Sequence, residues 1–215
     1  MDSTNPESLQ VIYDVPIIFE VYKNGRIERY RKHDFSPPSN NSVTGVRSKD
    51  IVIVSENNVT SFFLSGDSSG ANIAHNMMLR ASIDEDDKLE VGDSLNLVGM
   101  ALIHPYFGNN EPDRIWSYIC PENPNTDDPR CNPAAHPSLL SKLVCSNILI
   151  CTAEKDFIRD RGWTYYEALK KCGWKGEVEI KETQGEQHVF HLNNPTCDKA
   201  KVLMKWLADF FQQSS

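Results

Sequence analysis

The chain of 215 residues has no excess of basic charge and no long apolar run. It carries 22 Lys and Arg against 30 Asp and Glu, a formal net charge of −8. That balance argues against nucleic acid or an anionic membrane as a partner. No stretch approaches the roughly 18 consecutive apolar residues of a membrane-spanning helix. With 40% hydrophobic residues, the chain is expected to form one globular domain over residues 1–215.

The sequence also lacks Cys-x-x-Cys spacing and a secretory leader. Its first eight residues, 1–8, are acidic and polar, unlike the basic and then apolar start of a signal peptide. We therefore expect a cytoplasmic protein with reduced thiols, without a disulfide framework, a metal site or a cofactor. The six cysteines are Cys120, Cys131, Cys145, Cys151, Cys172 and Cys197.

The most informative motif is Gly-x-Ser-x-Gly at residues 66–70, between an apolar run at 61–65 and a helix-like run at 71–81. This strand–turn–helix context is typical of a nucleophile elbow. A β-carbon at Gly66 or Gly70 is expected to clash in so tight a turn. The turn would expose the Ser68 hydroxyl and direct the Ser69 N–H at a developing oxyanion. The alternative is a glycine-rich turn in which Ser68 only caps the helix.

A serine nucleophile needs a base and an acid, which this arrangement places downstream in the order Ser, Asp, His. Residues 147–153 form a continuous apolar run typical of a buried parallel strand. Asp156 lies in the loop that follows, before a helix expected over about 160–172. The carboxyl end of such a strand is where open α/β sheets place ligand-binding groups. The alternative is an ordinary solvated loop aspartate.

The candidate base is His188. Apolar and charged residues alternate at 178–182, which predicts a half-buried strand, and the loop 183–192 follows it. His188 falls in this loop, ahead of an amphipathic helix at about 196–211. His191 is a rival three residues later, nearer that helix, and either histidine is also compatible with a plain polar loop.

These blocks resemble the plant carboxylesterases of the hormone-sensitive-lipase branch of the α/β-hydrolases. The similar segments are residues 19–29, 66–76, 153–163 and 185–191, in the family's order. The resemblance implies an α/β-hydrolase-like parallel sheet flanked by helices. It also implies Ser68 as nucleophile, Asp156 as acid, His188 as base and the Ser69 N–H as one oxyanion donor. Gln187 departs from the family, which usually has glycine there.

The larger departure is a missing loop. The family carries a His-Gly-Gly loop before the elbow, whose N–H groups supply most of the oxyanion hole. Here the histidine upstream of Ser68, His33, is followed by aspartate. The strand after that loop is missing too, which suggests an internal deletion near 60–61. We therefore expect an incomplete sheet without central strands, an unpaired apolar edge at 61–65 and weakened catalysis.

Other segments complete the predicted organisation. Residues 17–30 read as a hairpin turning at Asn24-Gly25, after a loose start over 1–15. Residues 31–50 read as a polar linker, 51–54 and 97–104 as strands, and 82–94 as an acidic loop. The segment 107–140 is the expected cap, with a short helical patch near Trp116. Its aromatic residues either line a substrate pocket or simply pack (Phe107, Trp116 and Tyr118).

The predicted function is that of a serine carboxylesterase acting on small-molecule acyl esters. One alternative is a catalytically inactive truncated form or a binder of a small hormone-like molecule, since the family includes the gibberellin receptors. Those receptors have lost the triad histidine, whereas His188 is present here. A further alternative is an enzyme like the hydroxyisoflavanone dehydratases of the same branch.

Overall fold

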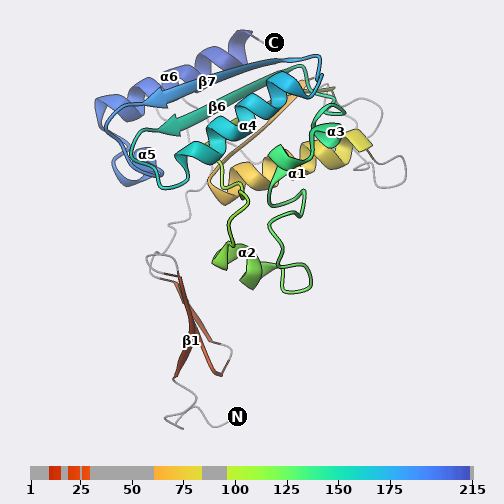
Figure 1. Cartoon of the computed structure of the whole chain (residues 1–215). Helices are drawn as coiled ribbons and strands as arrows, with labels where there is room; N and C mark the ends of the chain where they lie inside the picture. Colours follow the sequence, from red (N-terminus) through yellow and green to blue (C-terminus); the bar gives the residue numbers. More distant parts are fainter. Residues whose placement is uncertain (1–9, 16–18, 25, 30–60, 84–95, 214–215) are drawn as a thin grey trace, which may run out of the picture. The chain divides into compact units, whose positions relative to one another are not determined.

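A computed structural model describes residues 10–15, 19–24, 26–29, 61–83 and 96–213 (Figure 1). The chain divides into two compact units, Met1–Val54 and Ser55–Ser215, which are described separately. The predicted linker 31–50 and strand 51–54 lie outside the described residues, as does most of the acidic loop 82–94.

The first unit contains a three-stranded antiparallel sheet in the order β1-β2-β3. Strands β2 (Phe19–Tyr22) and β3 (Ile27–Arg29) correspond to the predicted hairpin. The expectation of a loose start is wrong for β1 (Val11–Val15), which pairs with β2. Its sequence, Val-Ile-Tyr-Asp-Val, is rich in β-branched and aromatic residues, which favour a strand.

The second unit is built on a parallel sheet in the order β4-β5-β6-β7. Its strands are β4 (Ser61–Asp67), β5 (Asn96–Ile103), β6 (Asn147–Ala153) and β7 (Glu177–Thr183). The bounds of β6 are those predicted, because its apolar residues are buried on both faces, as parallel strands require. In the described residues β4 pairs with β5 alone, so it stands at an edge of this sheet.

Helices cover both faces of the parallel sheet (Figure 1). Helices α1 (Ser69–Ile83) and α4 (Arg159–Lys171) pack on one face, around a core that includes Met78, Met100 and Tyr165. Helices α5 (Phe190–Asn193) and α6 (Asp198–Gln213) pack on the other face. The predicted apolar stripe of the last helix is confirmed, since Leu203 and Leu207 are buried there.

The connection from β5 to β6 carries only short helices, α2 (Arg114–Ile119), η2 (Pro133–Ala135) and α3 (Pro137–Leu140). Helix α2 is the helical patch predicted near Trp116. None of the helices in the described residues has the length and apolar composition that a membrane crossing requires.

Candidate active site

The carboxyl ends of the four parallel strands lie on the same side of the sheet, because the strands all run in one direction. Ser68 follows β4, His104 follows β5, Asp156 lies just beyond β6, and His188 lies in the loop after β7. The sheet order therefore brings together four polar side chains from positions that span 120 residues.

Ser68 is held in a left-handed backbone conformation with φ of 54°. Its N–H donates to the Ile103 carbonyl at 2.9 Å, and its own carbonyl accepts from Tyr106 N–H at 3.0 Å. The carbonyl also accepts from the first turn of α1, while the hydroxyl contacts His188. The backbone carbonyl of Ser68 thus caps the start of α1, while its hydroxyl contacts His188 and is not the side-chain cap considered as the alternative.

The two motif glycines differ in their surroundings. A β-carbon at Gly66 would lie 2.4 Å from the carbonyl carbon and oxygen of Gly70, so that position requires glycine. The expected clash at Gly70 is wrong, because a β-carbon there meets nothing within 4 Å in the described structure. The close approach comes from the strand side of the turn, where Gly66 faces the backbone of α1.

A chain of hydrogen bonds links the three residues predicted for catalysis. His188 Nε2 lies 2.9 Å from Ser68 Oγ, and His188 Nδ1 lies 2.8 Å from Asp156 Oδ2. The other carboxylate oxygen of Asp156 accepts the Ile158 N–H at 2.9 Å. Only 1% of the Asp156 side chain is exposed. A buried carboxylate fixed at both oxygens can hold the imidazole with Nδ1 protonated and Nε2 free to accept a proton.

His191, the rival base, does not contact Ser68. Its Nε2 lies 2.6 Å from Oδ1 of Asp67, the residue before the serine. His191 is buried, and its Nδ1 has no hydrogen-bond partner in the described structure. The Asp67–His191 pair therefore joins the elbow to the segment after His188, a connection that no local sequence pattern indicated.

His104 lies near the candidate site although no site role was predicted for it. The sequence indicated only that it ends the predicted strand 97–104. It is 1% exposed, and its ring centroid lies 5.8 Å from that of His188. Burial lowers its pKa to about 4, an effect that the nearby Asp156 carboxylate partly offsets. At neutral pH the ring is therefore uncharged.

His104, Asp156 and His188 also have ligand-type atoms within 4.8 Å of one another, the one such cluster in the described residues. However, His188 Nδ1 and Asp156 Oδ2 already bond to each other, and His104 Nδ1 accepts a backbone N–H. We therefore assign no metal to this cluster.

An exposed aromatic side chain lies beside His188. Phe157 follows Asp156 directly, is 74% exposed, and places its ring centroid 5.1 Å from that of His188. So exposed an aromatic side chain beside the imidazole offers an apolar surface to a bound molecule.

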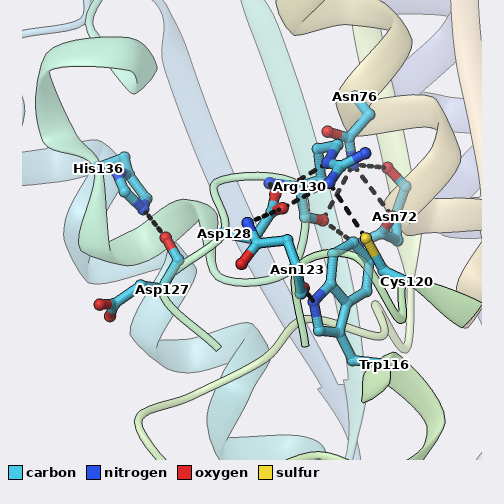
Figure 2. Close-up of polar contacts among 9 residues, drawn as sticks. All are labelled: Asn72, Asn76, Trp116, Cys120, Asn123, Asp127, Asp128, Arg130 and His136. Carbon is cyan, nitrogen blue, oxygen red and sulfur yellow. Dashed lines mark hydrogen bonds and ion pairs between the residues drawn. The ribbon is translucent and has the colours of Figure 1, made fainter. Parts of the chain in front are cut away.

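The segment 107–140, predicted as the cap, is hydrogen-bonded to helix α1 through the backbone of Arg130. Figure 2 shows the Asn72 and Asn76 side-chain amides donating to the Arg130 carbonyl, at 2.8 and 3.2 Å. The Arg130 guanidinium bonds both carboxylate oxygens of Asp128, at 2.9 and 2.6 Å, and lies over the Trp116 ring. This hydrogen-bonded guanidinium lowers the pKa of Asp128. The segment 107–140 is thus tied to helix α1, which follows Ser68.

The aromatic residues of the segment 107–140 that were predicted to line a pocket or to pack differ in their burial. Phe107 is buried in the core, where its ring centroid lies 4.6 Å from that of Tyr165. Trp116 is also buried, and its indole N–H donates to the Asn123 carbonyl at 3.1 Å. Tyr118 is partly exposed.

Sequence comparison identifies relatives among plant enzymes. A family model described as alpha/beta hydrolase fold matches residues 52–192. The chain is 40% identical over 168 residues to "Probable carboxylesterase 2" of Arabidopsis thaliana, covering 71% of this chain and 51% of the relative. It is 34% identical over 165 residues to a "2-hydroxyisoflavanone dehydratase" of Glycyrrhiza echinata, covering 69% and 49%. The predicted resemblance to plant carboxylesterases is confirmed.

Solved structures agree on the fold. Carboxyl esterase 2 from the fungus Tuber melanosporum superposes with a TM-score of 0.56 at 17% identity, over 72% of this chain and 55% of that one. An esterase from the archaeon Pyrobaculum calidifontis gives 0.53 at 20% identity, over 71% and 53%. The predicted class, a parallel sheet flanked by helices, is confirmed. The chain spans about half the length of the curated relatives that it matches.

Proposed function

The chain belongs to the alpha/beta hydrolase fold family, and on that premise we propose that it is a serine carboxylesterase acting on small-molecule acyl esters. The observation that carries the proposal is the hydrogen-bond chain from Ser68 through His188 to Asp156, at 2.9 and 2.8 Å. The names of the plant relatives, probable carboxylesterases, support the same reaction class.

In the proposed mechanism Ser68 Oγ attacks the ester carbonyl while His188 Nε2 takes its proton. The tetrahedral intermediate collapses as His188 returns that proton to the departing alkoxide, which leaves as an alcohol. Water, deprotonated by His188, then attacks the acyl-enzyme and releases the carboxylic acid. Asp156 orients the imidazole and stabilises its charged form throughout.

The step with the weakest support from the protein is stabilisation of the oxyanion in the tetrahedral intermediate. Ser69 begins α1 directly after the nucleophile, and its N–H is the proposed donor at this helix N-terminus. The family's other donors belong to the His-Gly-Gly loop, which an internal deletion near 60–61 would have removed. Loss of a single donor costs about 10²–10³ in turnover. We therefore propose a slow esterase.

The alternatives predict different behaviour. A dehydratase, which the relative from Glycyrrhiza echinata suggests, would release water from its substrate without forming an acyl-enzyme. A catalytically inactive form or a hormone-like binder would form no covalent adduct at all. The cytoplasmic location stays a prediction, and two relatives from Tulipa gesneriana are named as chloroplastic.

Covalent labelling by a fluorophosphonate tests the proposal. A nucleophilic Ser68 should take up one phosphonate group per chain, located on Ser68 by peptide mass mapping. Ser68→Ala should abolish the labelling. Ser65→Ala, at an exposed serine on β4, is the matched control and should label like the parent chain. A folded parent chain that takes up no label, or takes it up equally after Ser68→Ala, contradicts the proposal.

A further inference from the structure

His104 and Val189 are joined by a hydrogen bond between two unusual backbone positions. Val189 N–H donates to His104 Nδ1 at 2.8 Å, across 85 residues of sequence. His104 has φ of 46° and Val189 has φ of 47°. Left-handed conformations are rare for residues other than glycine, and a β-branched residue such as valine is an outlier there. Surrounding structure must therefore hold Val189 in place.

The hydrogen bond between His104 and Val189 affects the candidate base His188, because Val189 is its neighbour in the chain. Val189 is the residue after His188, so its φ sets the direction in which the chain leaves the imidazole-bearing residue. The next residue, Phe190, begins α5 and is buried in the core on one face of the sheet. The chain must turn sharply between an imidazole that faces Ser68 and a phenyl ring that faces the core. The left-handed Val189 makes that turn.

His104 is well anchored for such a role. Its backbone N–H donates to the Cys151 carbonyl at 2.7 Å, which ties the end of β5 to β6. Its ring packs against three residues of the segment after β7, with centroids 5.8 Å from His188, 5.8 Å from Phe190 and 5.4 Å from His191. The acceptor for Val189 N–H is therefore carried by a buried side chain on the sheet.

The hydrogen bond also determines the state of the ring. Nδ1 can accept only if it carries no proton, so the ring must be neutral with its proton on Nε2. The Nε2 atom is buried without a hydrogen-bond partner in the described structure. An unpartnered buried N–H costs stability. His104 thus accepts the Val189 N–H through Nδ1, while its Nε2–H has no acceptor among the described residues. An apolar core residue at this position would bury no such unpaired N–H.

We infer that His104 is a positioning residue for the base: its Nδ1 holds the left-handed backbone of Val189, and thereby keeps His188 Nε2 within reach of Ser68 Oγ. The inference rests on the proposed function for its kinetic consequence, although its structural part does not. The alternative is that His104 merely fills space between the loop and the sheet.

Three substitutions separate an acceptor from a filler. His104→Asn places an amide oxygen at the position of Nδ1, and asparagine tolerates left-handed φ. His104→Leu keeps bulk but removes the acceptor. His104→Gly also removes the acceptor and adopts left-handed φ without strain, so it covers the case in which leucine does not fold. Circular dichroism and urea unfolding establish which variants are folded.

The kinetic readout is ester hydrolysis. A base displaced by about 1 Å can cost about 10²-fold in rate. His104→Leu and His104→Gly should therefore lower kcat by about 10- to 100-fold with little change in KM, whereas His104→Asn should restore most of kcat. Parent kcat in the leucine or glycine variant, or equal loss in the asparagine variant, would overturn the inference.

A second readout separates this inference from the proposed function. The proton on His188 Nδ1, hydrogen-bonded to Asp156, gives a downfield NMR signal that His188→Gln assigns. The signal should persist in the parent chain and in His104→Asn, and should be lost or broadened in the leucine and glycine variants. If the parent chain shows no Ser68-dependent turnover, the proposed function fails. The NMR signal then tests the positioning role of His104 without the kinetic measurement. An identical signal in all variants, or its loss in the folded asparagine variant, would overturn the inference.

Discussion

The carboxylate of Asp67 lies 2.6 Å from Nε2 of His191, so the residue before the candidate nucleophile is bonded to the third residue after the candidate base. The two residues are 124 positions apart in the chain. The contact joins the end of β4 to α5. It lies next to the Ser68–His188 hydrogen bond in the sequence, since Asp67 precedes Ser68 and His191 follows His188.

Removal of this carboxylate should destabilise the fold. In Asp67→Ala the buried His191 side chain loses its partner, which should lower the free energy of unfolding by about 1–3 kcal/mol. Asp67→Asn keeps an oxygen that can accept from Nε2–H and should stay close to the parent chain. Urea unfolding measures both. An Asp67→Ala variant that unfolds at the parent's urea concentration would show that the contact contributes nothing.

Asp156→Asn should impair catalysis more than stability. The amide keeps the shape of the buried side chain, but its NH₂ group can donate to His188 Nδ1 and favour the wrong tautomer. In the serine protease triad the same change lowers kcat by about 10⁴-fold. We expect a loss of similar order in the rate of phosphonate labelling of Ser68, measured beside urea unfolding. Labelling at the parent rate would exclude Asp156 as the residue that orients His188.

The stability of the protein should fall as the pH drops below about 6.5. Burial lowers the pKa of His75 to about 3 and that of His104 to about 4, from 6.5 in the unfolded chain. Between these values the unfolded chain binds more protons, so acid favours unfolding. Each histidine contributes up to about 1.4 kcal/mol per pH unit. Above pH 6.5 this contribution is complete and constant.

Urea unfolding between pH 7.5 and 5 measures this slope. The lower limit of pH 5 avoids the titration of Asp113 and Asp128, whose pKa values are lowered from 3.8. His75→Gln, which keeps a polar partner for the Tyr165 hydroxyl, should remove about half of the slope. A slope that is flat in the parent chain, or unchanged in the variant, contradicts this prediction.

The two elbow glycines form a matched pair for a stability test. Gly66→Ala forces a β-carbon to within 2.4 Å of the Gly70 backbone and should prevent folding or lower stability severely. Gly70→Ala meets open space within helix α1, where alanine is favoured over glycine by about 1 kcal/mol. Thermal unfolding compares the two. Equal losses for both variants would show that the turn does not have the described geometry.

The sequence predicted the parts of this structure that depend on local composition. The apolar run of β6 marked both of its ends, since each of its faces is buried. Ser68, Asp156 and His188 each follow a predicted strand, and parallel strands place their carboxyl ends at one edge. It could therefore be predicted that the three residues gather at the carboxyl ends of the strands. The distances between their atoms could not, because these depend on the register of three strand pairs.

The remaining features depend on contacts between distant segments. Nothing near His104 in the sequence indicates that its ring accepts from Val189, 85 residues later. The Asp67–His191 contact is equally non-local. Strand β1 is a different case, because its run of β-branched and aromatic residues was a usable signal. Gly70 shows the reverse error, since a motif glycine was assigned a steric role that its surroundings do not require.

Hydrolysis of a short-chain chromogenic ester by the purified chain tests the central claim most directly, with Ser68→Ala and His188→Gln measured beside it and the fold of each checked by circular dichroism. The account predicts slow turnover in the parent chain that disappears in both variants. Turnover that persists after Ser68→Ala, or none above that variant from a folded parent chain, would contradict the assignment of Ser68, His188 and Asp156 as a working catalytic triad.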